Sequence, residues 1–290
     1  MEAAGVACGA LSLPSDASSP ASASVTLSDG TMFPMVSFGL QVYDDDRAKK
    51  YTLEALEAGY RNFFASVLAQ NQRGFGRAVR ESNVARSDIF VCGSVLSNRA
   101  RGFDAAFASS KQGCDENLRA LDVGPLDMIM LDYPGPDDDS IRGQWAALEQ
   151  MHKEGKVRSL SVSNFSPQQL DVILKDPTFS LKPTVNQLPI GVGYKTTYNK
   201  RQIDENTKRG ILVQAWSPLR VVGPNAKSLC AEIGALYNKS PQQIALKYLL
   251  QRGIAFTTQS TKKNRIQESI DLFDFDLSPA DLAKLDEVQG

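Results

Sequence analysis

Residues able to bind a planar amide and a phosphate recur where short apolar runs of this sequence end. They are Ser163, Asn164, Gln187, Trp216, Ser217, Leu219, Ser260, Arg265 and Glu268. Ser163, Asn164 and Gln187 can hold a carboxamide by hydrogen bonds, and the Trp216 ring can stack on the planar ring that carries it. Ser260 and Arg265 open a helical segment, where phosphate is readily bound. The pattern predicts a site for a planar, amide-bearing ligand that also carries phosphate.

Eight apolar runs with strand character must position these side chains. The runs are Met35–Leu40, Asn62–Phe64, Ile89–Val95, Leu126–Leu131, Val157–Val162, Thr184–Leu188, Ile211–Ala215 and Ile254–Thr258. Helical patterns separate them at 46–58, 73–82, 103–121, 140–153, 167–174, 199–209, 226–250 and 262–272. This alternation indicates parallel βαβ units, and eight of them favour an α/β fold of the closed (β/α)8 TIM barrel type.

An open doubly wound sheet is the alternative architecture. It would need a G-x-G-x-x-G motif after an early strand, and Gly74-Phe-Gly76 lacks the third glycine. In the barrel, the chemistry is expected where the strands end at the C-terminal face.

The two ends of the chain carry further signals. Residues 1–24 are rich in Ala, Ser and Pro and predict a flexible tail, so the barrel is expected over 25–290. Asp29-Gly30 within Val25–Pro34 predicts a β-hairpin with a two-residue turn. Ser278 is expected to cap a terminal helix.

Composition narrows the class of protein. The chain has 290 residues, of which 42% are hydrophobic and 22% charged, and a formal net charge of −1. Neither a nucleic-acid surface nor a membrane span is expected. Four scattered cysteines do not form a disulfide framework, so we expect a reducing compartment, the cytoplasm or a plastid. A single histidine and dispersed cysteines also argue against a zinc or iron site.

Several segments together resemble the aldo-keto reductase family over about residues 25–290. The matching segments are Leu53–Arg61, Gly76–Ser82, Glu154–Phe165, Val185–Gln187 and Ala215–Leu219. The resemblance implies an NADP(H)-binding barrel that reduces aldehydes or ketones. It also implies a catalytic tetrad of Asp and Tyr after strand two, Lys in strand three and His at the end of strand four. Tyr delivers the proton in that tetrad, and the nicotinamide supplies the hydride.

The four positions that match the tetrad carry other residues in this sequence. The Asp position is Phe64, the Tyr position is Ala69, the Lys position is Ser94 and the His position is Asp132. All four residues of the family's catalytic tetrad are therefore replaced in this sequence. Losing both members of a buried Asp–Lys pair avoids the cost of leaving one charge unpaired, so the Phe64 and Ser94 replacements fit together.

Other ionisable side chains near these positions are candidates for an alternative proton donor. Asp132 is either a partly desolvated carboxyl with a raised pKa, able to act as an acid, or a solvated or Arg-paired carboxylate. Tyr133 is either a second proton donor or part of the pocket wall. Cys92 either lines the cavity at the barrel mouth or belongs to the hydrophobic core. His152, the only histidine, is expected on the solvent face of a helix.

The cofactor end departs from the family pattern in part. The Lys that pairs with the 2′-phosphate of NADP in the family falls on Gln259, whereas Arg265 is kept. The late Asn of that helix becomes Ser269, and Gln41–Tyr43 replaces a Gly-Thr-aromatic segment that lies near the pyrophosphate. We expect NADP(H) binding that is weakened rather than lost.

Three functions follow as hypotheses. The first is a pseudoenzyme, a binding, regulatory or structural subunit with a possible protein partner. The second is an NADP(H)-dependent oxidoreductase of carbonyl compounds with Asp132 or Tyr133 as a rebuilt acid. The third is a non-redox enzyme at the same mouth. The acidic runs Asp44–Asp46 and Asp137–Asp139 are read as helix starts and loops rather than as a cation site.

Overall fold

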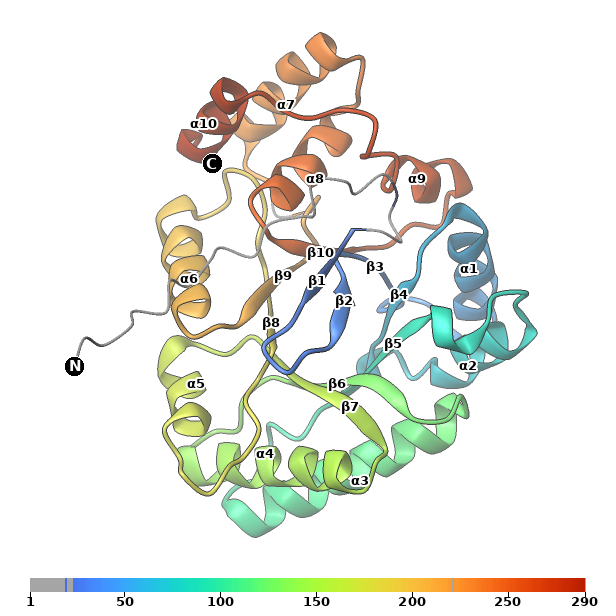
Figure 1. The fold of residues 1–290 in the computed structure, drawn as a ribbon, viewed down its shortest axis with the longest axis vertical. Coiled ribbons are helices and arrows are strands. Elements are labelled where there is room, and N and C mark those ends of the chain that lie inside the picture. The colour runs from blue at the N-terminus through green and yellow to red at the C-terminus, as the bar shows by residue number, and fades with distance from the viewer. Residues whose placement is uncertain (1–18, 20–22, 221, 290) are drawn as a thin grey trace, which may run out of the picture.

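Eight parallel strands form a closed barrel in the computed structural model, which describes residues 19, 23–220 and 222–289. Around the barrel the strands follow the order β10-β3-β4-β5-β6-β7-β8-β9 (Figure 1). Their bounds are β3 Val36–Gly39, β4 Asn62–Ala65, β5 Phe90–Val95, β6 Leu126–Asp132, β7 Val157–Ser163, β8 Val185–Leu188, β9 Leu212–Trp216 and β10 Ala255–Thr258. Closure between β10 and β3 confirms the barrel and excludes the open sheet.

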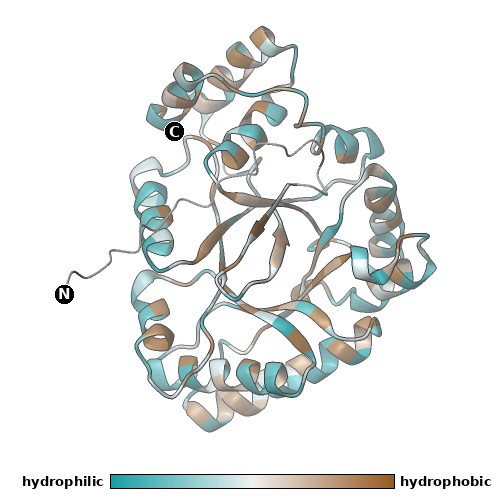
Figure 2. Ribbon diagram, viewed as in Figure 1, coloured by the Kyte–Doolittle hydropathy of each residue, from teal (hydrophilic) through white to brown (hydrophobic). Residues whose placement is uncertain are grey.

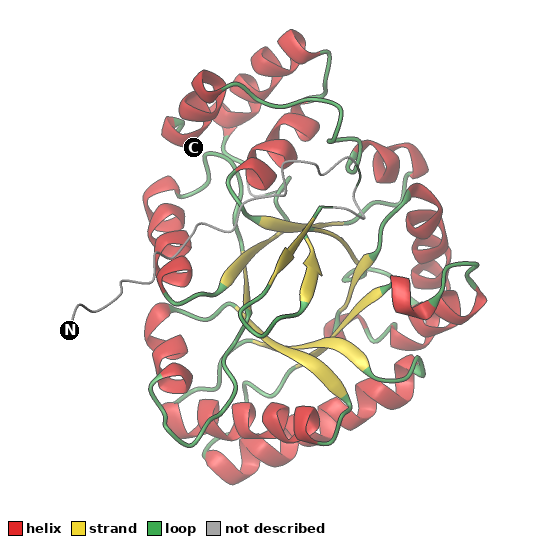
Figure 3. Cartoon of the chain, in the orientation of Figure 1, coloured by secondary structure: helices red, strands yellow, loops and turns green. Residues whose placement is uncertain are grey.

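Helices surround the strands in the order expected for βαβ units (Figure 3). They are α1 Asp45–Ala58, α2 Gln72–Glu81, α3 Phe103–Leu121, α4 Asp138–Lys153, α5 Pro167–Leu174, α6 Thr196–Lys208, α7 Pro224–Tyr237, α8 Pro241–Gln251, α9 Lys263–Glu268 and α10 Pro279–Glu287. Two 3-10 turns, η1 Val67–Ala69 and η2 Arg86–Asp88, complete the connections.

An antiparallel hairpin covers the end of the barrel opposite the strand C-termini. Its strands, β1 Ser24–Thr26 and β2 Met32–Pro34, lie over the centre of the barrel (Figure 1). The Phe33 ring packs edge-on against Phe90 at the start of β5, with 5.2 Å between ring centroids. The opposite, C-terminal end is the one at which barrels of this type place their chemistry.

The hairpin turn has three residues rather than the predicted two. Leu27 N–H donates to Thr31 O at 2.9 Å, so Ser28, Asp29 and Gly30 form the loop. Gly30 has φ +84°, the left-handed conformation that a three-residue hairpin loop needs. Most of the tail predicted over 1–24 lies outside the described residues, but Ser24 already belongs to β1.

Two helix predictions also need correction. The single helix predicted over 226–250 is two helices, since Asn238 takes the left-handed conformation and ends α7. Ser240 then caps α8 through a capping box with Gln243, and Pro241 occupies its first turn. The helix predicted over 262–272 is the short α9, which ends at Glu268. Ser278 caps α10 as predicted, by accepting from Asp281 N–H.

The strands are largely buried on both faces because each separates the barrel interior from the helix layer. Residues of β3, β4, β5 and β10 are buried without exception. Teal, hydrophilic residues are frequent along the surrounding helices, whereas brown, apolar segments are frequent along the strands (Figure 2). This pattern is the near-continuous hydrophobic run typical of parallel strands.

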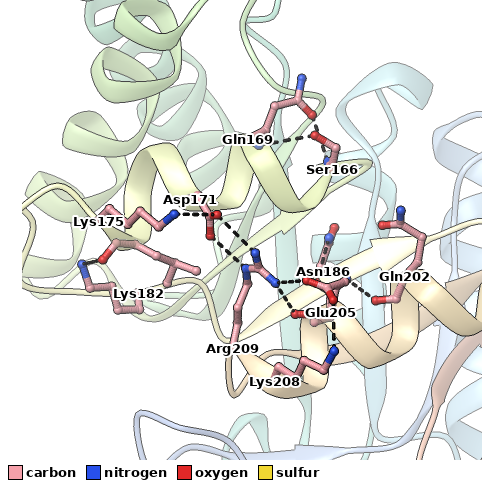
Figure 4. A network of polar contacts seen from close by, with 12 residues as sticks. Ser166, Gln169, Asp171, Lys175, Lys182, Asn186, Gln202, Glu205, Lys208 and Arg209 are labelled. Carbon is pink, nitrogen blue, oxygen red and sulfur yellow. Dashed lines mark hydrogen bonds and ion pairs between the residues drawn. The ribbon is translucent and has the colours of Figure 1, made fainter.

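Polar contacts fix α5 and α6 against β8 on one side of the barrel (Figure 4). Arg209, just after α6, binds Asp171 of α5 at 2.9 Å and Glu205 at 2.7 Å. Asn186 of β8 points outward and donates to Asn206 Oδ1 at 3.0 Å. Since side chains alternate along a strand, the neighbouring Gln187 points into the barrel.

Candidate active site

The mouth of the barrel is shaped by unusual backbone at three strand ends. Tyr133, Asn164 and Ser217 directly follow β6, β7 and β9, and their φ values are +69°, +63° and +50°. Non-glycine residues rarely adopt this conformation, which costs about 1–3 kcal/mol and clusters at functional sites. The sharp turns direct the residues at these strand ends toward a common opening, as predicted for this end of the barrel.

Asn164 connects two strand ends across this opening. Its Oδ1 accepts a hydrogen bond from Trp216 Nε1 at 3.1 Å, although β7 and β9 are separated by β8. Its Nδ2 donates to Ser163 Oγ at 2.9 Å and makes a long contact of 3.4 Å with Asp132 Oδ1. Both ends of the Asn164 amide are therefore occupied by protein atoms.

Asp132 is a buried carboxyl at the end of β6. Only 6% of its surface is exposed. Burial raises the pKa of Asp132 from 3.8 to about 6, and hydrogen bonds from Ser163 and Asn164 offset part of that increase. In the described part of the chain, Asp132 forms no ion pair with Lys, Arg or His. Asp132 is therefore a buried carboxyl without a cationic partner in the described structure, and its role as an acid stays a prediction.

Gln187 lies one strand further along and is also hydrogen-bonded within the protein. Its Nε2 donates to Gln214 Oε1 of β9 at 2.8 Å, and both side chains are buried. Gln214 was not among the predicted site residues. Its position two residues before Trp216 places it on the same face of β9, a signal that strand alternation could have supplied.

A cavity of about 190 Å³ opens between β3, β9 and β10 at the mouth. It is lined by Gly39, Gln41, Ser217, Pro218, Leu219, Arg220, Thr257, Thr258 and Gln259. A Cβ at Gly39 would lie 2.9 Å from Thr257 Oγ1, so glycine keeps this wall open. The Thr257 hydroxyl is buried and has no hydrogen-bond partner within the described structure. An orphaned hydroxyl beside a cavity suits a polar ligand such as a dinucleotide backbone.

The predicted phosphate residues lie beside this cavity, after β10. Arg265 is exposed and Glu268 is half-buried, both on α9. Ser260 Oγ accepts from Lys262 N–H at 3.1 Å. Lys263 is held by Glu57 at 2.8 Å, whereas Lys262 and Arg265 form no ion pair among the described residues. Two cations therefore remain available for an anionic ligand at this edge of the mouth.

The other three residues that the sequence comparison placed at the tetrad positions make structural contacts. Phe64 is 2% exposed and belongs to the hydrophobic core. Ser94 Oγ accepts from Val67 N–H at 2.8 Å and lies 3.3 Å from Ala65 O, so it fastens the β4–α2 connection. Ala69 ends the 3-10 turn of that connection. Phe64 and Ala69 carry no polar side-chain group, and the Ser94 hydroxyl is already hydrogen-bonded to this connection.

Three other side chains are candidates for reactive groups, and they differ in their burial and position. Cys92 is a core residue, and burial raises the pKa of its thiol. Tyr133 is exposed, with its pKa raised by burial of part of the ring and by the nearby Asp132 charge. His152 is half-buried and lines a groove with the hairpin loop at the closed end of the barrel, far from the mouth.

The acidic runs start helices, as interpreted from the sequence. Asp44 and Asp137 accept from backbone N–H groups as N-caps of α1 and α4. Asp45 accepts from Gly74 N–H at 2.7 Å. Within the described residues, no cluster of His, Cys, Asp and Glu is arranged to hold a metal ion. Nor does that part of the chain contain a helix with the length and hydropathy of a membrane span.

Comparison with known proteins accounts for this architecture. The aldo/keto reductase family model matches residues 30–289. The chain is 32% identical to a glyoxal reductase of Bacillus subtilis over 264 residues, covering 90% of this chain and 91% of the relative. It is 30% identical to a 9,11-endoperoxide prostaglandin H2 reductase of Trypanosoma cruzi, covering 91% of this chain and 90% of the relative.

Solved structures show the same relationship. The crystal structure of an aldo/keto reductase from Brucella melitensis matches with a TM-score of 0.82 and 28% identity, covering 91% of this chain and 98% of the other. An aldo-keto reductase from a deep-sea metagenome library matches with a TM-score of 0.82 and 26% identity, covering 92% and 94%. This chain belongs to the aldo-keto reductase family.

Proposed function

We propose that this barrel binds NADP(H) but does not carry out the family's carbonyl reduction, and that it acts as a binding or regulatory subunit with a protein partner. The observation that carries the proposal is the state of the four aligned positions. Phe64 is in the core, Ser94 fastens a loop, Ala69 has no polar group and Asp132 has no cationic partner. A carbonyl oxygen in this mouth meets no tyrosine, lysine or histidine donor at these positions.

The amide groups of the mouth support weaker nicotinamide binding. In this proposal the carboxamide competes with Trp216 and Ser163 for Asn164, and with Gln214 for Gln187. Each displaced hydrogen bond has a net worth of about 0.5–1.5 kcal/mol, so the competition lowers affinity without abolishing it. The cavity beside Thr257 and the exposed Arg265 supply the remaining contacts.

Binding and turnover can be tested separately on the full chain. NADPH is titrated against tryptophan fluorescence, which has two sources, Trp216 at the mouth and the buried Trp145 of α4. The Trp216→Phe variant identifies the signal from the mouth. NADPH consumption is then followed with a panel of aldehydes, ketones and dicarbonyls. Quenching without consumption supports the proposal, and consumption that depends on Trp216 or Arg265 overturns it.

A second candidate function rests on Asp132. A buried carboxyl with a pKa of about 6 is partly protonated near neutral pH and is suited to general acid catalysis. In this function the chain reduces carbonyl compounds with Asp132 as the rebuilt donor. Turnover that is lost in Asp132→Asn supports the second function, whereas turnover that survives this change excludes it.

The proposed setting is a reducing compartment, the cytoplasm or a plastid. Cys92, Cys114 and Cys230 are buried free thiols. This state suits such a compartment.

A further inference from the structure

Around Asp132 the polar character of the mouth is inverted relative to a site for carbonyl groups. A carbonyl oxygen accepts hydrogen bonds, so a site that holds it must present donors. The end of β6 places the buried Asp132 carboxyl at the mouth. When ionised, a carboxylate only accepts hydrogen bonds. The part of the mouth next to Asp132 therefore favours a ligand group that donates them.

Asp132 is also incompletely satisfied by its own surroundings. Its contact with Asn164 Nδ2 is 3.4 Å, which is longer than an ordinary hydrogen bond. Ser163 and Asn164 are both neutral, and no cation of the described chain pairs with the carboxyl. A buried charge with neutral partners alone is costly, so a bound cation would stabilise it strongly.

Exposed apolar side chains surround the same opening. Val42, Leu68 and Tyr133 follow β3, β4 and β6, and their exposures are 64%, 59% and 38%. The indole of Trp216 is half-buried at the end of β9. Apolar residues gathered at one end of a fold mark a binding site more often than they do when scattered singly.

We propose that the mouth binds a protonated amine carried on an apolar body, with the ammonium group on Asp132 and the apolar body among the loops of Leu68 and Tyr133. This inference deepens the proposed function and rests on it in one respect, namely that the mouth still serves as a small-molecule site. The ammonium group displaces the long Asn164 contact and replaces it with a charge-assisted hydrogen bond.

Four benzyl compounds that differ only in their polar group provide the test. Benzylamine, benzyl alcohol, benzaldehyde and benzoate are each titrated into the full chain by isothermal titration calorimetry, with and without NADPH. Benzylamine is expected to bind about tenfold more tightly than benzyl alcohol, because charge-assisted hydrogen bonds are roughly twice as strong as neutral ones. Benzoate is expected not to bind. Benzaldehyde or benzoate binding as tightly as benzylamine overturns the proposal.

Two matched variants assign the effect to Asp132. Asp132→Asn keeps the shape and removes the charge, and it is expected to reduce benzylamine affinity to that of benzyl alcohol. Asp204→Asn removes an exposed carboxylate from α6, outside the mouth, and is expected to leave benzylamine affinity unchanged. Equal benzylamine affinity in Asp132→Asn and the unmodified chain overturns the proposal.

The NADPH titration separates this inference from the proposed function. Benzylamine binding without NADPH binding contradicts the proposed function and supports the amine site. NADPH binding without a preference for benzylamine contradicts the amine site and leaves the proposed function supported.

Discussion

The Trp216 indole donates its N–H to Asn164 Oδ1 at 3.1 Å, and this contact joins the ends of β9 and β7 across the barrel mouth. The same amide turns its nitrogen toward Ser163 and Asp132. In the proposed function, Trp216 therefore has two effects on a bound nicotinamide. Its ring offers a stacking surface, while its N–H occupies an acceptor that the carboxamide would use.

These two effects of Trp216 can be separated by substitution. Trp216→Phe keeps a ring and frees Asn164 Oδ1, so NADPH affinity is expected to stay within about threefold of the unmodified chain. Trp216→Ala removes the stacking surface, worth about 0.5–1.5 kcal/mol beyond buried area, and is expected to weaken NADPH by about tenfold. Calorimetric titration measures both, and equal losses in the two variants would contradict a stacking role.

Asp132→Asn is expected to stabilise the fold at neutral pH. In the unmodified chain, burial raises the pKa of the Asp132 carboxyl from 3.8 to about 6. The ionised carboxyl therefore destabilises the folded state. This difference corresponds to at most about 3 kcal/mol of unfolding free energy. The penalty is absent below about pH 4, where both folded and unfolded chains are protonated, and is fully present above about pH 6.

Urea unfolding of the unmodified chain and Asp132→Asn across this pH range checks the prediction. The stability difference should grow as pH rises from about 4 to 7. A difference independent of pH would show that Asp132 acts through packing rather than through its charge.

Phe64 and Ser94 are expected to be coupled. Phe64→Asp places an unpaired carboxylate in the core and should cost about 3–5 kcal/mol of stability. Ser94→Lys alone should also destabilise, because it buries a cation and removes the Val67 hydrogen bond. The double variant should be more stable than the sum of the single effects predicts, by about 1–3 kcal/mol.

Calorimetric melts of the four proteins complete this double-mutant cycle. Phe64→Leu serves as the control for lost ring volume, without a new charge. Strictly additive effects would mean that the two positions do not contact each other as an Asp–Lys pair.

Gln259→Lys is expected to strengthen NADPH binding selectively. Gln259 is exposed and lines the cavity between β3, β9 and β10. A lysine there adds a charge-assisted contact to the 2′-phosphate, worth about 1.5 kcal/mol or roughly tenfold in affinity. NADH lacks that phosphate and provides the control. A matching gain for NADH would place the new lysine elsewhere on the dinucleotide.

Much of this architecture was predictable because it depends on local patterns. Eight apolar runs between helical segments specify parallel βαβ units, and the strand ends identified Ser163, Asn164 and Trp216. The missed break between α7 and α8 was also local, since Ser240-Pro241 is a helix-start signal inside an apolar pattern. The three-residue hairpin loop depends on the pairing of Leu27 with Thr31, which the Asp-Gly signal alone does not fix.

Contacts between strands distant in sequence could not be predicted in this way. The Trp216–Asn164 and Gln187–Gln214 hydrogen bonds join residues 52 and 27 positions apart, and side-chain orientation decides them. The absence of a cation near Asp132 in the described structure is likewise a property of the folded mouth. These contacts, rather than the list of residue types, set the polarity of the site.

A single-turnover experiment tests whether NADPH bound to this barrel can reduce a carbonyl compound. The protein is held in excess over NADPH so that all cofactor is bound, as verified by quenching of Trp216 fluorescence, and glyoxal or another small carbonyl is then added. If the proposed function is right, bound NADPH is not oxidised above the rate of a protein-free control. Oxidation of bound NADPH above that rate, with recovery of the reduced alcohol, would contradict it.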